Sequence, residues 1–206
     1  LYAQSDSMHP AYIPTSKWSP ALYVVDDHFI SIPPDTPPVA FVIRVGLYEL
    51  GSMKPLGSVE LPEVVYVSPK SPARIPRKYF QAFPGESINL LGYNLTQESN
   101  QIILALYWRA EKKVSHDLQV FVHLIDAQGN IVAQADGPPA NGLYPTSKWL
   151  PGQVVEDIHK LIVPFRTNPK AILVGLYDLS TLQRIPAFRE EGVRWENDAI
   201  RIELGQ

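Results

Sequence analysis

Two aspartate–histidine pairs with the same spacing are the residues of this sequence best suited to chemistry. Asp157 and His159 lie two positions apart, and Asp26 and His28 repeat that spacing. An Asp-x-His pair can supply two ligands to a metal ion, or a base together with the carboxylate that orients it. The alternative is structural: a buried aspartate that accepts hydrogen bonds from a turn, beside a satisfied core histidine. We favour the structural interpretation, because both copies keep the pair together with a Thr-Ser-Lys-Trp turn.

That turn offers the partners that a buried aspartate needs. Its backbone amides, the hydroxyls of Thr146 and Ser147 and the indole of Trp149 could all donate to Asp157. We therefore expect Asp157 and His159, and likewise Asp26 and His28, to form a structural polar pair that fixes the turn.

Aromatic side chains suggest a second kind of site. Trp149, Tyr144 and Trp195 could form a platform on which the C–H faces of sugars stack. Trp149 belongs to the repeated turn, however, where a large ring could equally plug the open end of a β-sandwich. Carbohydrate binding by these residues requires that all three are exposed on one surface.

Acidic residues give little sign of catalysis. A glycosidase needs two carboxylates that face each other across a cleft, whereas Glu190-Glu191 and Glu196 to Asp198 are sequence neighbours typical of solvated surface. The chain also has no cysteine, no phosphate-binding glycine loop and no nucleophile elbow. We expect no catalytic residue, no metal site and no cofactor, except that loop aspartates such as Asp126, Asp136 and Asp198 could hold a structural calcium ion.

The segments that must position these residues occur twice. Residues 145–159 match residues 14–28 at nine of fifteen positions, at a constant offset of 131. Residues 174–179 then match residues 45–50 at an offset of 129. An internal repeat of this kind indicates one structural unit that is used twice.

Side-chain alternation within the repeat predicts which face is buried, since successive side chains of a strand point to opposite faces. One face is nearly the same in both copies and is expected to point inward: Val155, Asp157, His159, Leu161 and Val163, matched by Val24, Asp26, His28, Ile30 and Ile32. The other face shares little between the copies and is expected to point outward.

Composition indicates an all-β protein with many short strands. Hydrophobic residues make up 45% of the chain, and 20 prolines exclude long helices. Alternation and turn residues predict the following strands: 22–32, 40–50 and 63–67, then 87–95, 101–109, 118–126, 131–135, 154–163, 171–179, 184–187 and 199–204. Strands at this spacing favour an antiparallel β-sandwich of jelly-roll type.

Charge and hydropathy exclude two classes of partner. The net charge is −3 with acidic and basic residues interspersed, which argues against nucleic-acid binding. The longest apolar runs fall well short of the roughly 20 residues needed to span a bilayer, so no membrane span is expected. The first residues show no signal peptide, so if the protein is exported we expect its export signal to lie upstream.

The repeat also predicts the domain organisation. Residues 61–206 look like a complete β-sandwich domain, and residues 1–60 look like the C-terminal half of a second copy, because the counterpart of residues 61–130 would precede residue 1. Such a half-unit exposes strand edges, so we expect it to dock on the second unit or on a neighbouring chain, or to form a homodimer. Alternatively, both repeats contribute strands to one sandwich.

The order of several motifs resembles that of a known family. Residues 85–93, 106–108, 120–126, 136–137, 144–149 and 174–178 resemble, in this order, the β-sandwich domains at the C-termini of bacterial polytopic glycosyltransferases related to the dolichyl-phosphate-mannose protein mannosyltransferases. The resemblance covers about residues 80–204 and, through the repeat, 12–50. In that family the active site belongs to the membrane-embedded part, so the resemblance implies an accessory domain on the outer face of a bacterial membrane, with no catalytic residues.

We therefore expect a non-catalytic, extracytoplasmic domain of a larger, membrane-anchored glycosyltransferase-like protein. It would engage glycans or substrate, contact the membrane-embedded part of the same protein, or act as a spacer. A free-standing carbohydrate-binding module is the first alternative, and a glycoside hydrolase-type enzyme is the second.

Overall fold

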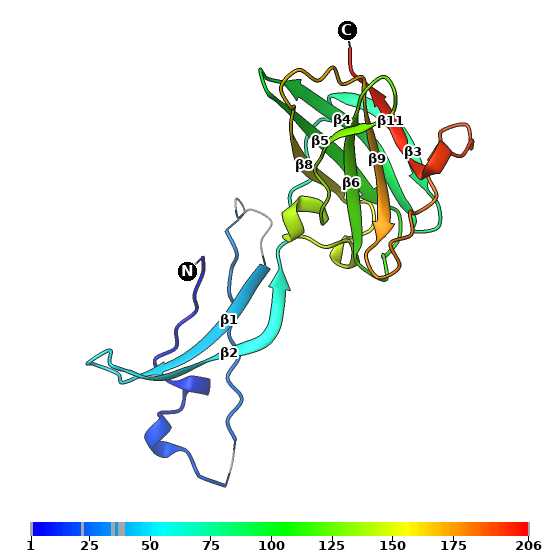
Figure 1. The fold of residues 1–206 in the computed structure, drawn as a ribbon. Helices are drawn as coiled ribbons and strands as arrows, with labels where there is room; N and C mark the ends of the chain where they lie inside the picture. The colour runs from blue at the N-terminus through cyan, green and yellow to red at the C-terminus, as the bar shows by residue number, and fades with distance from the viewer. Residues whose placement is uncertain (1, 22, 34–35, 37–39, 206) are drawn as a thin grey trace. The chain divides into compact units, whose positions relative to one another are not determined.

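The structure is a computed structural model that describes residues 2–21, 23–33, 36 and 40–205, and the described chain forms two units. The first unit spans Leu1–Val67 and the second spans Ser68–Gln206. The chain is mostly β, with three antiparallel sheets, so the predicted all-β class is confirmed at this level (Figure 1). None of the described helices is long and apolar enough to cross a bilayer.

The first unit contains one β-hairpin and two short 3₁₀ turns. The turns are η1 (Pro10–Tyr12) and η2 (Thr15–Lys17), and the hairpin pairs β1 (Ala40–Tyr48) with β2 (Pro55–Tyr66). Val42 pairs with Val64 and Arg44 with Glu60, so one residue of β1 faces three of β2 in a bulge. Pro62 lies in this bulge, where its missing N–H disrupts no ladder hydrogen bond.

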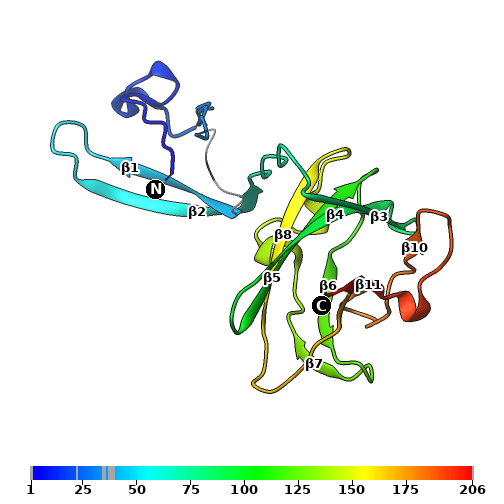
Figure 2. The same cartoon turned by 90° about the horizontal axis from the view of Figure 1, so that it is seen from above.

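The second unit contains nine strands in two sheets. One sheet has the order β10-β3-β4-β5-β8 and the other the order β11-β9-β6-β7 (Figures 1 and 2). Its strands are β3 (Arg77–Phe83), β4 (Ile88–Gln97), β5 (Gln101–Ala110), β6 (Leu118–Ile125), β7 (Ile131–Gln134), β8 (Val154–Ile162), β9 (Ala171–Asp178), β10 (Phe188–Arg189) and β11 (Ile200–Glu203). Three 3₁₀ turns lie between strands: η3 (Pro139–Gly142), η4 (Thr146–Lys148) and η5 (Glu196–Asp198).

The buried side chains of the second unit come from both of its sheets. Leu106 and Trp108 of β5 and Val122 of β6 are fully buried. The Tyr79 hydroxyl of β3 donates to the Arg201 carbonyl of β11 (3.0 Å), which links the two sheets. The sequence predicts most of these strands within a few residues, because alternating β-branched and aromatic residues mark them well.

Several predictions differ from the structure. The strand predicted at 63–67 is the end of a longer strand, β2, which begins at Pro55. Residues 23–32 form no strand, although they match β8 in sequence, because no neighbouring strand pairs with them among the described residues. The strand predicted at 184–187 is only a bridge from Arg184 to Tyr177. β3 was not predicted, since its charged first residues hide the alternation. The unit boundary lies after Val67, because β2 continues through residue 60.

Some predicted features fall outside the described residues. Leu22, the first residue of the predicted strand 22–32, is one of them. Most of the proline-rich connection at residues 33–38 also lies outside.

Candidate functional site

Asp157 is the centre of a buried hydrogen-bond cluster that we call the aspartate lock. It consists of Asp157, His159, Trp108 and the backbone amide of Ala140. Asp157 Oδ1 accepts from the Ala140 N–H (3.0 Å), and Oδ2 accepts from the Trp108 indole (3.2 Å) and lies 2.7 Å from His159 Nε2. Asp157 is 1% exposed and His159 is 7% exposed. The lock therefore joins strands β5 and β8 to turn η3 (Pro139–Gly142).

The burial agrees with the predicted inward face of β8, but the partners of Asp157 differ from those expected. The Trp149 indole donates to the Tyr144 carbonyl (2.9 Å), not to Asp157. The Thr146 hydroxyl accepts from the Leu118 amide and donates to the His116 carbonyl. Asp157 instead holds Ala140, whose φ of +51° is a left-handed conformation that a non-glycine residue adopts only when surrounding contacts enforce it.

Both ring nitrogens of His159 are engaged. Nδ1 lies 2.7 Å from the Ala135 carbonyl, which can only accept, so Nδ1 carries a hydrogen. A second proton must then lie between Nε2 and the Asp157 carboxylate, because two lone pairs would repel at that distance. Desolvation alone would lower the pKa of His159, but the hydrogen bond and charge of Asp157, together with Ala135 and Asp136, raise it. The pair is thus an ion pair held between protein groups.

The first unit contains a copy of the same lock. Asp26 Oδ1 accepts from the Ala11 N–H (2.8 Å), and Asp26 Oδ2 lies 2.7 Å from His28 Nε2. Ala11 also has a left-handed φ of +48°. The backbone hydrogen bond from Ala11, followed by the bond to His28, lowers the pKa of Asp26. Here, however, the side chains of the pair are partly exposed, 27% for Asp26 and 36% for His28.

The predicted sugar platform is not formed by the three aromatic residues. Trp149 and Tyr144 are 1% and 2% exposed and pack inside the second unit. The Tyr144 hydroxyl donates to the Lys148 carbonyl (2.7 Å), so this ring holds turn η4 (Thr146–Lys148) closed. A ring buried on both faces has no surface for a sugar, and the platform prediction is corrected for these two residues. Trp195 is half-buried and lies elsewhere.

The loop aspartates that could have held calcium are used within the protein. Asp126 accepts from the Gln128 and Asn130 amides of its own turn. Asp136 accepts from the Val122 amide, and Asp198 pairs with Arg194. Across the described ranges, no three His, Asp or Glu side chains are grouped closely enough to hold a metal ion.

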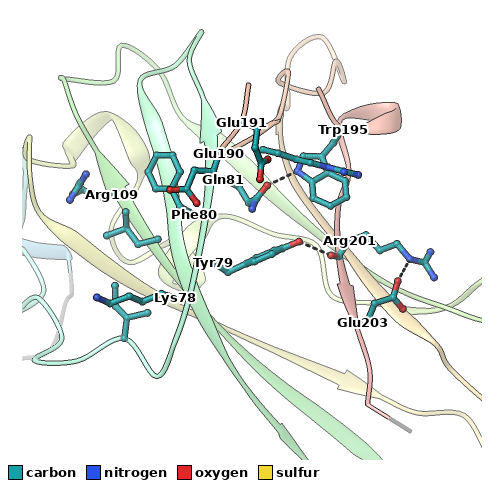
Figure 3. Close-up of a pocket in the computed structure, with 13 residues that line it drawn as sticks. Lys78, Tyr79, Phe80, Gln81, Arg109, Glu190, Glu191, Trp195, Arg201 and Glu203 are labelled. Carbon is teal, nitrogen blue, oxygen red and sulfur yellow. Dashed lines mark hydrogen bonds and ion pairs between the residues drawn. The ribbon is translucent and has the colours of Figure 1, made fainter. Parts of the chain in front are cut away.

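Trp195 lines an open groove of about 940 Å³ in the second unit, which we call the β3–β11 groove (Figure 3). Strand β3 supplies Lys78, Tyr79 and Gln81, the segment after β10 supplies Glu190 and Glu191, and β11 supplies Arg201 and Glu203. Arg109, Arg189, Leu91, Ile75 and Phe80 complete the lining. The groove therefore combines rings, hydrocarbon and charges of both signs.

Several groove side chains are fixed by neighbours. The Trp195 indole donates to Gln81 Oε1 (2.6 Å), and the Arg189 guanidinium lies 4.1 Å from the centre of the indole ring. Desolvation raises the pKa of the Tyr79 hydroxyl, whose hydrogen bond to the Arg201 carbonyl holds the ring against the sheet. The indole is thus presented in one orientation, in the way that preorganised binding sites hold an aromatic anchor.

Charged groups at the groove remain available. Within the part of the chain that the structure describes, the side chains of Lys78, Glu190 and Glu191 make no hydrogen bond or ion pair. Arg201 Nε donates to Glu203 Oε1 (2.5 Å) at an exposed position. An array of free donors and acceptors beside a fixed ring can bind a ligand that has many hydroxyls.

Sequence reasoning found Trp195 but missed its neighbours. Tyr79 and Gln81 lie on the strand that was not predicted, and Arg201 lies more than a hundred residues further along the chain. Only the pairing of β10 with β3 and the inter-sheet contact bring them together. Comparisons with protein families, with curated proteins and with solved structures found no match for this chain.

Proposed function

We propose that the second unit is an antiparallel β-sandwich of jelly-roll type that serves as a non-catalytic accessory domain and binds glycans in the β3–β11 groove. The observation that carries this proposal is the fixed indole of Trp195, held by Gln81 and Arg189. Beside it lie Lys78, Glu190 and Glu191, whose side chains are unpaired within the described residues. Sugars present apolar C–H faces that stack on aromatic rings and hydroxyls that need both donors and acceptors. The groove offers each of these features.

The non-catalytic part of the proposal is supported by the state of the buried ionisable residues. Perturbed ionisable groups often mark active sites. Here the most buried pair, Asp157 and His159, is saturated by the Ala140 amide, the Trp108 indole and the Ala135 carbonyl. Such a pair holds a turn and has no free position for a substrate.

The cellular setting of the proposal rests on the family resemblance. In that reading the domain lies outside the cytoplasm of a bacterial cell, as part of a membrane-anchored glycosyltransferase-like protein. Binding of glycan or of the substrate at the groove would then bring acceptor chains close to the membrane-embedded part.

The test is a glycan-array screen of the intact chain, followed by calorimetric titration of the bound glycans. Trp195→Ala should weaken binding by about tenfold or more, since loss of the stacked ring removes at least about 1.4 kcal/mol. Phe165→Ala is the matched control, because Phe165 is an exposed ring beside Arg166 outside the groove. Absence of binding to any glycan, or equal loss in both variants, would refute the groove as a glycan site.

A further inference from the structure

The hairpin of the first unit has one open edge. By the repeat offset of 129, β1 (Ala40–Tyr48) is the counterpart of β9 (Ala171–Asp178). In the second unit β9 pairs with β11 on one side and with β6 on the other. β1 pairs with β2, and among the described residues no strand occupies its other side. The position taken by β6 is therefore vacant in the first unit.

The same hairpin has an uncovered apolar face. On β9 the core-facing residues are completely buried, namely Ile172, Val174 and Leu176. Two of their counterparts, Val45 and Leu47, are 49% and 55% exposed, and Val59, which pairs with Val45, is 59% exposed. One end of this face is partly covered by the Tyr2 ring, which packs edge-on against Phe41 (centroids 5.0 Å apart).

The opposite face of the hairpin is more polar. It carries the Arg44–Glu60 ion pair and Ser58, together with one exposed apolar pair, Val42 and Val64. An additional layer would therefore bury the apolar face. In the second unit, the core-facing side of β9 is buried in this way and the five-stranded sheet forms the other layer.

A glycine on β1 leaves space for a specific side chain. In the second unit a Cβ on Gly175 would come within 2.4 Å of the Phe121 ring, so the glycine is required by that ring. Among the described residues, its counterpart Gly46 has no comparable neighbour, since a Cβ there would meet nothing closer than 3.7 Å. Glycine weakens a strand unless something packs over it. Gly46 therefore keeps the space that a phenylalanine at the position of Phe121 would fill.

Residues 23–32 point to the same missing partner. They match β8, which pairs along its length with β5. Without a β5 counterpart they form no strand, and the apolar side chains of Val25, Phe29 and Ile30 stay exposed. The hairpin edge, the apolar face and the space over Gly46 are explained by a missing counterpart of β6, and the unpaired segment by a missing counterpart of β5.

We propose that the first unit is a docking surface for a polypeptide segment with the strand pattern of residues 77–134. The segment would add a β6-like strand antiparallel to β1, with an aromatic residue over Gly46 and β-branched residues beside Val45 and Leu47, as Phe121, Val122 and Val120 pair with β9. A β5-like strand of the same segment would pair with residues 23–31. Backbone hydrogen bonds at the edge and burial of the apolar face provide the affinity.

The test adds a fragment of residues 68–137 of this sequence to the intact chain and follows amide hydrogen exchange by mass spectrometry. Exchange in residues 40–48 and 23–31 should slow by about tenfold or more, because both segments gain strand partners. Localised protection separates this docking from exchange of the fragment into the second unit, which would alter residues 154–178. Unchanged exchange in residues 40–48 would overturn the proposal.

Two variants and a control sharpen the test. Val45→Asp puts a charge on the apolar face, and Gly46→Val fills the space for the aromatic ring, so each should abolish the protection. Met53→Asp makes the same kind of change at the exposed hairpin tip and should leave it intact. A dimer of the chain that protects residues 40–48 without any fragment would assign the face to a second copy and overturn the proposal.

Discussion

The two copies of the aspartate lock have nearly the same hydrogen bonds in very different surroundings. In both, an aspartate accepts from an alanine amide in a left-handed turn and lies 2.7 Å from a histidine two residues later. The Thr-Ser-Lys turns also end in the same way in both copies. The tryptophan after each turn, Trp18 or Trp149, donates its indole N–H to the carbonyl five residues earlier. Only in the second copy is the aspartate–histidine pair buried. Only there does the segment that contains the pair form a strand, β8. The turn is thus encoded locally, whereas the strand depends on a neighbour.

The largest difference between the copies should come from their tryptophans. Trp149→Ala should destabilise the second unit by about 3–5 kcal/mol, because it leaves a cavity where a fully buried ring was. Trp18→Ala removes a ring that is already 38% exposed, and should leave the melting of the second unit unchanged. Thermal unfolding followed by near-ultraviolet circular dichroism measures both. Similar losses of stability in the two variants would contradict the idea that the contribution of each tryptophan depends on its burial and not on the turn that it follows.

The aspartates give the next largest effect. Asp157→Ala should cost about 3 kcal/mol, because it strands the charge of His159 and the buried donors of Trp108 and Ala140. Asp26→Ala should have a much smaller effect, confined to exchange of the Ala11 amide, since water can replace the lost carboxylate. Chemical denaturation and hydrogen exchange distinguish the two. An unchanged denaturation midpoint for Asp157→Ala would show that the aspartate lock does not stabilise the second unit.

The paired glycines predict a smaller contrast. Gly175→Ala should destabilise the second unit by about 1–3 kcal/mol, because the new methyl group collides with the Phe121 ring and the Asp198 carbonyl. Gly46→Ala should be neutral in the isolated chain, where its neighbours are 3.7 Å away. Denaturant titration compares them. If Gly46→Ala were as destabilising as Gly175→Ala, the space over Gly46 would already be filled.

The smallest effect is a pH dependence of the buried lock. The folded-state pKa of His159 is raised, so its protonation stabilises the fold below its ordinary pKa of about 6.5, and that contribution is lost as pH rises through the folded-state value. The melting temperature of the second unit should therefore fall above neutral pH, more steeply than in His159→Gln. Parallel profiles for the two proteins would show that another group causes the fall.

Part of this picture could be predicted from sequence. The alternation of Val155, Asp157 and His159 correctly gives the buried face of β8, because a strand with one covered face must keep its period of two. The same pattern in Val24, Asp26 and His28 predicts a strand that the structure does not contain. A strand needs a neighbouring strand for its backbone hydrogen bonds, and the sequence of one segment does not say whether that neighbour is present. Burial of Trp149 depended in the same way on what packs around it.

The groove could not be predicted at all. Its parts come from β3, from the turn around Trp195 and from β11, and only the sheet pairing brings Gln81 to the Trp195 indole. Trp195 alone could be proposed from sequence, because a tryptophan ring can stack on the C–H face of a sugar. Gln81 and Tyr79 carry no such signal in a linear sequence.

Pro62 gives the hairpin of the first unit two unequal sides. The bulge around this residue and its missing donor interrupt the outer margin of β2. A strand can therefore join the hairpin beside β1 but finds a poor ladder beside β2. Addition at one side stops after a single event, so the hairpin should accept one added segment in a discrete complex and should not propagate strand pairing into fibres.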